Sequence, residues 1–187
     1  MTILSAQTIR KLHLVDPLVE RQQHVETGCS FGLSACGYDV RLDQDITISP
    51  GCFVLASTME KFHMPRNVVG KVHDKSTWAR RGVAVQNTVI EPGWTGYLTL
   101  EISCNIMIGN YFTEYWKLPI RLGEVPKVVL PKGTPIAQIV FEFLDQPTEQ
   151  PYPEDGKYQN QERGVVEARS GVGRGQNETI FRPCPLG

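Results

Sequence analysis

Short β-prone segments, punctuated by glycine and proline, recur along most of this sequence and limit the folds that the chain can adopt. No helix-length segments alternate with them and no sequence repeat is present, so the pattern favours neither a parallel α/β sheet nor a repeat array. It predicts an all-β barrel or sandwich. The expected strands are residues 37–42, 46–48, 52–57, 61–64, 68–73, 83–90, 95–103, 128–130 and 136–143.

The beginning of the chain departs from this β pattern. Residues 5–14, SAQTIRKLHL, fit a short amphipathic helix with Ser5 as its N-cap. Ile9 and Leu12 are expected to face the interior of the protein. Residues 15–35 are polar and contain glycine, which indicates a loop.

Length and charge narrow the number of domains and the kinds of partner. The 187 residues include 41% hydrophobic side chains, enough to form a core, and carry a net charge of −1. After Leu144 large aliphatic residues become scarce, so we expect one β domain over residues 1–150 and an extended tail over 151–187. A nearly neutral chain lacks the basic surface that binds nucleic acid, so any nucleotide site must be local.

The sequence also bears on the compartment. No apolar run approaches the ~18 residues of a transmembrane helix, and residues 1–17 lack the features of a signal peptide. A cytoplasmic protein without a membrane partner is the expectation. The odd number of cysteines, without any C-x-x-C pair, argues against a structural zinc site or a disulfide framework. These are Cys29, Cys36, Cys52, Cys104 and Cys184.

Residues 71–101, KVHDKSTWARRGVAVQNTVIEPGWTGYLTLE, hold most of the candidate functional groups. The part before Gly82 fits a short helical turn that the glycine ends. Ser76 and Arg80 are four residues apart and share a face of that turn. In the strand over 95–103, alternation places Glu101 on the face opposite the leucines and isoleucine. Helical turn, strand, turn and strand are therefore expected to bring Ser76, Arg80 and Glu101 within reach of one another.

Five motifs follow in a fixed order: GYDVRL at 37–42, KSTWAR at 75–80, VIEPGW at 89–94, LTLE at 98–101 and KYQNQ at 157–161. Together they resemble the dCTP deaminase branch of the dUTPase-like superfamily. That family shows a G-R-S-S-L-A-R type segment, an I-D-P-G-W type turn and a strand ending in L-E. The resemblance covers residues 1–170. It implies a distorted β-barrel or jelly roll of the dUTPase-like type, with a few short helices and an extended C-terminal tail. It also implies a homotrimer with active sites between subunits.

The resemblance implies zinc-independent hydrolysis of dCTP to dUTP and ammonia in pyrimidine deoxynucleotide metabolism. Zinc-dependent cytidine-type deaminases need a P-C-x-x-C motif, which this chain lacks. One carboxylate can then move the protons if its pKa lies near neutrality, and Glu101 is the candidate. Arg80 is expected to orient that carboxylate, and Ser76 to hold the attacking water or the exocyclic amine. Without this context, Glu101 is more simply a solvated residue and Ser76 an N-cap.

Other residues of the motifs suit recognition of a deoxynucleoside triphosphate. Lys75 and Thr77 begin the helical turn, where backbone N–H groups can face an anion. In the resembled family, tail residues that match Tyr152, Lys157 and Gln161 close over the triphosphate. Mg²⁺ is expected to be held mainly by phosphate oxygens and water, without a metal site of the protein's own.

The turn after residue 90 is expected to receive the sugar, with Glu91 accepting the 3′-OH hydrogen bond and Trp94 excluding a 2′-OH. The segment Gln86, Asn87 and Thr88 matches the part of the family that binds the pyrimidine. Three features depart from the family pattern. Glu91 replaces an aspartate, Gln86–Thr88 differs from the usual Thr-Ala, and the segment before Ile90 is about two residues shorter. The preferred base, or its 5-substituent, therefore stays open.

Further interpretations stay open beside this one. Asp39 and Arg41 share a strand face, where a cross-strand ion pair is the simplest role and a subunit contact is the alternative. Residues 105–116 resemble an inserted aromatic hairpin that packs on a neighbouring subunit or in the core. A dUTP diphosphatase or a bifunctional enzyme is the rival activity, and a regulator with a dead site is a third possibility. The joint presence of Ser76, Arg80 and Glu101 argues against the regulator.

Overall fold

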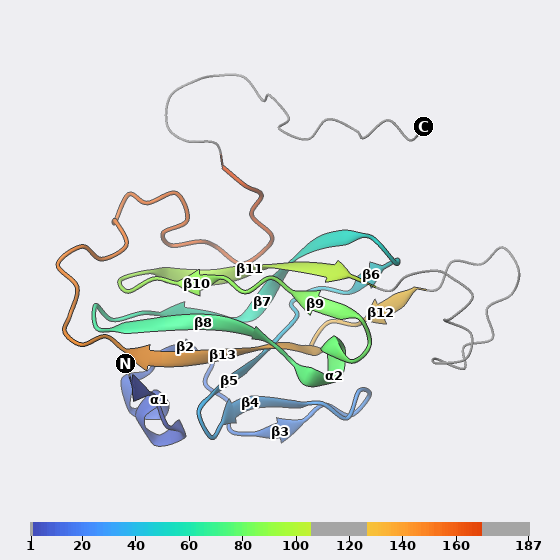
Figure 1. Cartoon of the computed structure of the whole chain (residues 1–187), viewed down its shortest axis with the longest axis horizontal. Helices are drawn as coiled ribbons and strands as arrows, with labels where there is room; N and C mark the ends of the chain where they lie inside the picture. The colour runs from blue at the N-terminus through green and yellow to red at the C-terminus, as the bar shows by residue number, and fades with distance from the viewer. Residues whose placement is uncertain (1, 106–126, 170–187) are drawn as a thin grey trace, which may run out of the picture.

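The segments punctuated by glycine and proline form antiparallel strands in the computed structural model, which describes residues 2–105 and 127–169 (Figure 1). In chain order the elements are β1 (Thr2–Ile3), α1 (Ala6–Leu12), β2 (Val15–Asp16), β3 (Gln22–Gln23), β4 (Ser30–Ser34), β5 (Gly37–Arg41), β6 (Ile46–Ile48), β7 (Phe53–His63), β8 (Val68–Asp74), α2 (Ser76–Ala79), β9 (Val83–Val85), β10 (Val89–Ile90), β11 (Thr95–Cys104), β12 (Val128–Leu130) and β13 (Pro135–Phe143).

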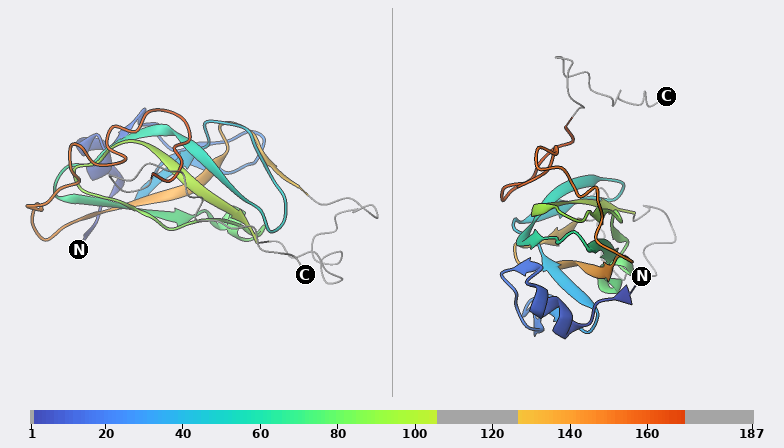
Figure 2. Two further views of the ribbon diagram at one scale, coloured as in Figure 1. Left: turned by 90° about the horizontal axis from the view of Figure 1, so that it is seen from above. Right: turned by 90° about the vertical axis from the view of Figure 1, so that its left-hand side faces the viewer.

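Two larger sheets curl around a common interior, as the end-on view of Figure 2 shows. The first has seven strands in the order β10-β8-β13-β5-β4-β3, with β1 paired to β13. The second has the order β2-β7-β11-β9, and β12 and β6 form a separate pair. The predicted all-β fold is confirmed.

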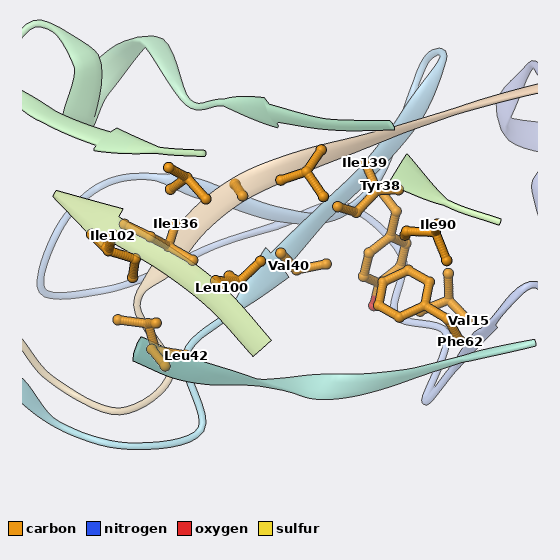
Figure 3. Packing of buried hydrophobic residues seen from close by; sticks show 14 of the residues in the cluster. Val15, Tyr38, Val40, Leu42, Phe62, Ile90, Leu100, Ile102, Ile136 and Ile139 are labelled. Atoms are coloured by element: carbon orange, nitrogen blue, oxygen red, sulfur yellow. The ribbon is translucent and has the colours of Figure 1, made fainter. Parts of the chain in front are cut away.

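Apolar side chains at alternate positions of the strands fill the interior, and Figure 3 shows several of them packed together. Alternation sends every second side chain of a strand to the same face, so strands β5, β11 and β13 each contribute a row to one core. Burial of such side chains contributes about 25 cal/mol per Å² of apolar surface. The fully buried members of these rows are Tyr38, Val40, Leu100, Ile102, Ile136 and Ile139.

The N-terminal helix is confirmed, but the loop predicted for residues 15–35 is wrong. Helix α1 buries Ile9 completely, while the side chain of Ser5 makes no capping hydrogen bond. Strands β2, β3 and β4 lie within the supposed loop. Each is short and forms through pairing with a distant or preceding strand, such as β2 with β7. Local composition carries no signal of such pairing.

Two strand boundaries also differ from the sequence prediction. The segments expected at 52–57 and 61–64 are one strand, β7, which pairs with β11 on both sides of an irregularity between Tyr97 and Thr99. The strand expected over 83–90 is two strands, β9 and β10, which pair with different sheets. The hairpin predicted for 105–116 lies outside the described residues except for its first position.

The segment after β13 is bound to the second sheet. Between residues 145 and 169 the chain forms neither helix nor strand, yet it lies along the free edge of β11 (Figure 1). The Tyr97 N–H donates to the carbonyl of Gln161 over 3.0 Å. A Cβ atom at Gly96 would come within 2.9 Å of the Gln161 nitrogen, so only glycine permits this close approach.

Candidate active site

The turn that carries Ser76 is held against the barrel by its neighbours. Trp78 is buried and donates its indole N–H to the carbonyl of Pro135 on β13. Gly82 ends the turn with a φ of 73°, in agreement with the sequence prediction. Asp74 accepts the N–H of Val85 over 2.7 Å and so joins β8 to β9 around the turn. The position of α2 thus follows from buried anchors on both sides.

A cavity of about 930 Å³ lies beside α2, and Lys75, Ser76 and Thr77 are among its lining residues. The opposite walls come from the segment before β3 and from β4 and β5. Its volume is in the range of small-molecule sites, ~300–1,000 Å³. Three of the predicted substrate-contacting residues therefore share one cavity.

Lys75 and Asp39 form an ion pair within this cavity. Their N–O distance is 2.7 Å, and the side chains are only 10% and 6% exposed. Ser30 donates its hydroxyl to the same Asp39 oxygen over 3.2 Å. The other Asp39 oxygen is buried, and no described residue forms a hydrogen bond with it.

The two charged residues on this face of β5 each form an ion pair, but only the pair of Arg41 joins two strands. Arg41 contacts the carboxylate of Glu60 on β7 at 2.8 Å, whereas Asp39 bonds Lys75, which caps α2. Glu60 is fully buried, and burial raises its pKa against the opposing effect of Arg41.

Glu101 lies near the end of β11, opposite Leu55 of β7. The alternation predicted for this strand is confirmed, because Leu100 and Ile102 are buried in the core while Glu101 is on the other face and half-buried. Its Oε2 atom is buried, and no described residue donates a hydrogen bond to it. Burial raises the pKa of the Glu101 carboxyl.

No hydrogen bond or ion pair connects the Glu101 side chain with Ser76 or Arg80 among the residues that the structure describes. Ser76 and Arg80 are both exposed on α2, and the Arg80 backbone N–H donates to the Ser76 carbonyl. Glu101 is absent from the lining of the cavity next to α2. Within residues 2–105 and 127–169, no hydrogen bond or ion pair links its carboxylate to either residue. Ser76 and Arg80 therefore make no direct bond with the Glu101 carboxylate in this part of the chain, and their predicted proximity stays a prediction.

The turn at 91–94 and the KYQNQ motif are directly bonded, although the sequence predicted no contact between them. Trp94 is buried and donates its indole N–H to the carbonyl of Tyr158 over 2.7 Å. The Gln159 side chain donates to the Gly93 carbonyl and accepts the Thr95 N–H. These contacts depend on how the tail folds back on the turn. Neither the glutamine content of the tail nor any periodicity in its sequence indicates them.

The other tail residues of the predicted site occupy different environments. The Gln161 side chain is buried and donates to the hydroxyl of Thr99 over 2.7 Å. Tyr152 packs against the core, and its hydroxyl accepts the Tyr158 N–H. Lys157 is exposed and donates to the carbonyl of Arg169 over 3.3 Å. Thr99 is a residue that the sequence analysis did not assign to the site.

The residues predicted to meet the base and sugar lie at the edge of the first sheet. Gln86, Asn87 and Thr88 are exposed between β9 and β10, and Glu91 is exposed beside them. The Thr88 carbonyl accepts the N–H of Val72, which fixes this segment against β8. These four side chains are thus presented to solvent in one subunit.

Neither a metal cluster nor a membrane-spanning helix is found in the part of the chain that the structure describes. His24-Val25-Glu26 has the H-x-E spacing of zinc deaminases, but no group of three histidine, cysteine or acidic residues surrounds it there. No helix within residues 2–105 and 127–169 combines the length and hydrophobicity required to cross a bilayer.

Comparison with known proteins identifies several relatives. A family model described as dCTP deaminase-like matches residues 35–107. The dCTP deaminase of Azotobacter vinelandii is 32% identical over 86% of this chain and 96% of its own length. The dCTP deaminase of Roseiflexus castenholzii is 34% identical over 90% of this chain and its own full length.

Solved structures share the fold at lower sequence identity. The 2′-deoxycytidine 5′-triphosphate deaminase of Agrobacterium tumefaciens superposes with a TM-score of 0.54 at 17% identity, over 76% of this chain. The match spans 48% of that longer chain. A dUTPase from phage phi11 of Staphylococcus aureus superposes with a TM-score of 0.50 at 16% identity.

Proposed function

The chain belongs to the dCTP deaminase family, and we propose from this membership that it hydrolyses dCTP to dUTP and ammonia without catalytic zinc. Relatives named dCTP deaminase are 32–34% identical to it over most of its length. The observation in the structure that best supports this activity is the state of Glu101. A half-buried carboxyl with a raised pKa and an unpartnered oxygen is suited to repeated proton transfer.

In the proposed reaction Glu101 takes a proton from the attacking water, which adds to C4 of the cytosine. The same carboxyl passes that proton to N3, then takes the second proton from the hydroxyl now on C4 and gives it to the leaving amine. Both protons of the water are thus used, and no external acid is needed. Burial suits this role because the usual carboxyl pKa is too low for proton donation near neutral pH. Glu101→Gln is expected to reduce turnover by about 10² to 10⁴.

Ser76 and Arg80 are proposed to reach Glu101 from a neighbouring subunit of a homotrimer. Ser76 and Arg80 make no bond to Glu101 within the described residues of one chain, and both are exposed. A second copy can therefore contact them, which supports sites between subunits. Ser76 then holds the water or the amine, and Arg80 orients the carboxylate through charge-assisted hydrogen bonds.

The remaining candidate residues are assigned to the nucleotide. Lys75 and Thr77 bind the triphosphate in the cavity next to α2, and Lys157 approaches it from the tail. Mg²⁺ would be held mainly by phosphate oxygens and water and would offset part of the charge of the triphosphate. Tyr152 and Gln161 shape the tail that covers the site, while Glu91, Trp94 and the Gln86–Thr88 segment receive the sugar and base. The protein is proposed to act in the cytoplasm on this small molecule alone.

Product analysis tests the proposed activity. The purified protein is incubated with dCTP or dUTP in the presence of Mg²⁺, and nucleotides, ammonia and pyrophosphate are measured. The proposal expects dUTP and ammonia in equal amounts from dCTP. Release of dUMP and pyrophosphate from dUTP, without ammonia from dCTP, would overturn it in favour of a dUTP diphosphatase.

The assignment of Glu101 is tested in the same assay. Glu101→Gln should bind dCTP but lose turnover, whereas Glu154→Gln, which changes an exposed tail carboxylate, should retain it. Turnover close to wild type in Glu101→Gln contradicts the assignment.

A further inference from the structure

The charged residues lining the cavity next to α2 leave one cation without a partner. Those residues are Arg21, Asp39, Asp74 and Lys75. Lys75 is neutralised by Asp39 at 2.7 Å, and Asp74 accepts the backbone N–H of Val85. Within residues 2–105 and 127–169, none of the ion pairs involves Arg21. A polyanion entering this cavity therefore meets Lys75 as half of a neutral pair and Arg21 as a cation in no ion pair among these residues. Asp74 keeps its negative charge, because a backbone N–H does not neutralise a carboxylate.

The nearest acidic residue in sequence cannot easily neutralise Arg21. Glu20 is held by Arg10 through two parallel hydrogen bonds of 2.8 and 2.9 Å. Such a bidentate pair occupies both carboxylate oxygens. Arg21 keeps its guanidinium available while its neighbour is engaged outside the cavity.

Strand pairing places the segment with Arg21 at the cavity. Gln23 and Ser30 are direct partners in the β3–β4 ladder, and both line the cavity. Arg21 and Gln22 line it as well, so the cavity wall is continuous along residues 21–23.

The backbone just before Arg21 is also fixed. The Leu33 N–H donates to the carbonyl of Val19 over 2.9 Å. At Gly32, an added Cβ would lie 2.6 Å from the carbonyl oxygen of Glu20, so a side chain there would push this segment away from β4. Gly32 has a φ of +86°, which other residues rarely adopt. The close approach and the positive φ thus both require glycine at position 32, which lets the segment before Arg21 lie against β4.

We propose that Arg21 binds the triphosphate of the nucleotide across the cavity from Lys75, Ser76 and Thr77. The inference rests on the proposed function, in which Lys75 and Thr77 face the phosphates. A guanidinium presents its donors in a planar fork that matches two oxygens of a phosphate group, and it stays charged at any physiological pH. Arg21 supplies a guanidinium that forms no ion pair among the described residues, whereas Asp39 offsets the attraction of Lys75 for an anion.

Binding measurements on the full-length protein with dCTP and with deoxycytidine test this assignment. Hydrogen bonds to charged groups contribute enough that Arg21→Gln should weaken dCTP binding by about 10-fold to 100-fold. Binding of deoxycytidine should not change, because the nucleoside has no phosphate. Arg21→Lys should recover part of the loss. Lys11→Gln is the control, since it removes an exposed cation outside the cavity and should leave both affinities unchanged.

A Lys75→Ala variant separates failure of this inference from failure of the proposed function. If Lys75→Ala weakens dCTP preferentially while Arg21→Gln does not, the role of Arg21 is overturned and the phosphate site is retained. If neither variant discriminates between dCTP and deoxycytidine, the triphosphate does not bind in this cavity and both assignments are overturned. Equal weakening of both ligands by Arg21→Gln also overturns the inference, because it shows a structural effect.

Discussion

Gln161 donates its side-chain amide to the hydroxyl of Thr99 over 2.7 Å, and Thr99 precedes Glu101 by two residues on the same face of β11. The Val166 N–H donates to the same hydroxyl over 3.0 Å. On the neighbouring strand β7, the hydroxyl of Ser57 accepts the Gly164 N–H. The tail is therefore bonded to side chains on the sheet face that carries Glu101.

Gln161→Ala is expected to destabilise the folded protein by about 1–3 kcal/mol, because it removes a buried donor from a half-buried acceptor. Urea unfolding measures the change, and Gln150→Ala, at an exposed position of the same tail, is the control. Equal stability of the two variants would contradict a structural role for the Gln161–Thr99 bond.

Glu101→Gln should become more stable than the wild type as the pH rises. Burial raises the pKa of Glu101 in the folded protein above the value in the unfolded chain. Between these two pKa values the folded state binds more protons, so the wild-type free energy of unfolding falls with increasing pH. Glutamine does not titrate and escapes this loss. Thermal unfolding at about pH 4 and about pH 8 checks the difference, which should be larger at the higher pH.

Arg163→Gln is expected to loosen the tail without unfolding the barrel. Arg163 contacts Asp43 at 2.8 Å through Nε, and Lys132 lies 3.0 Å from the same carboxylate. Because Arg163 is 50% exposed, the pair contributes only about 0.2–1 kcal/mol, which corresponds to roughly twofold to fivefold faster cleavage of the tail by a protease. Arg10→Gln removes another exposed pair far from the tail and should leave the cleavage rate unchanged.

The ion pair between Arg163 and Asp43 should also weaken in acid. Burial alone would raise the pKa of Asp43, but hydrogen bonds from Arg163 and Lys132 outweigh it and hold that pKa below the ordinary value. The stabilisation is therefore present above the ordinary aspartate pKa and is lost as the pH falls through the lower folded value. Proteolysis of the wild-type tail that does not change between neutral and strongly acidic pH would contradict this, provided that an acid-tolerant protease is used.

A zinc-specific chelator, applied with Mg²⁺ present, is expected to leave dCTP turnover unchanged. The chain lacks the P-C-x-x-C motif of zinc-dependent deaminases, and Glu101 supplies the proton transfer in the proposed mechanism. Steady-state kinetics before and after exhaustive chelation provide the measurement. Activity that disappears and returns with added Zn²⁺ would show that the chain uses another deaminase chemistry.

The sequence by itself determined the features that depend on neighbouring residues. Alternation along 95–103 separated Glu101 from Leu100 and Ile102, and Gly82 marked the end of the turn that carries Ser76. The order of the five motifs indicated the family, and the punctuation by glycine and proline indicated an all-β fold. Such signals are local, because side-chain direction follows the backbone period and a left-handed residue favours glycine.

Only the tertiary structure decided which distant groups meet. The supposed loop over 15–35 became the strands β2, β3 and β4 through pairing, and the tail became bound to β11 through contacts such as Gln161 with Thr99. The cavity charges were likewise invisible in the sequence, because Asp39 and Lys75 are brought together by strand order. Long-range pairing depends on sheet register and burial, which arise from the whole fold and leave no local periodicity to read.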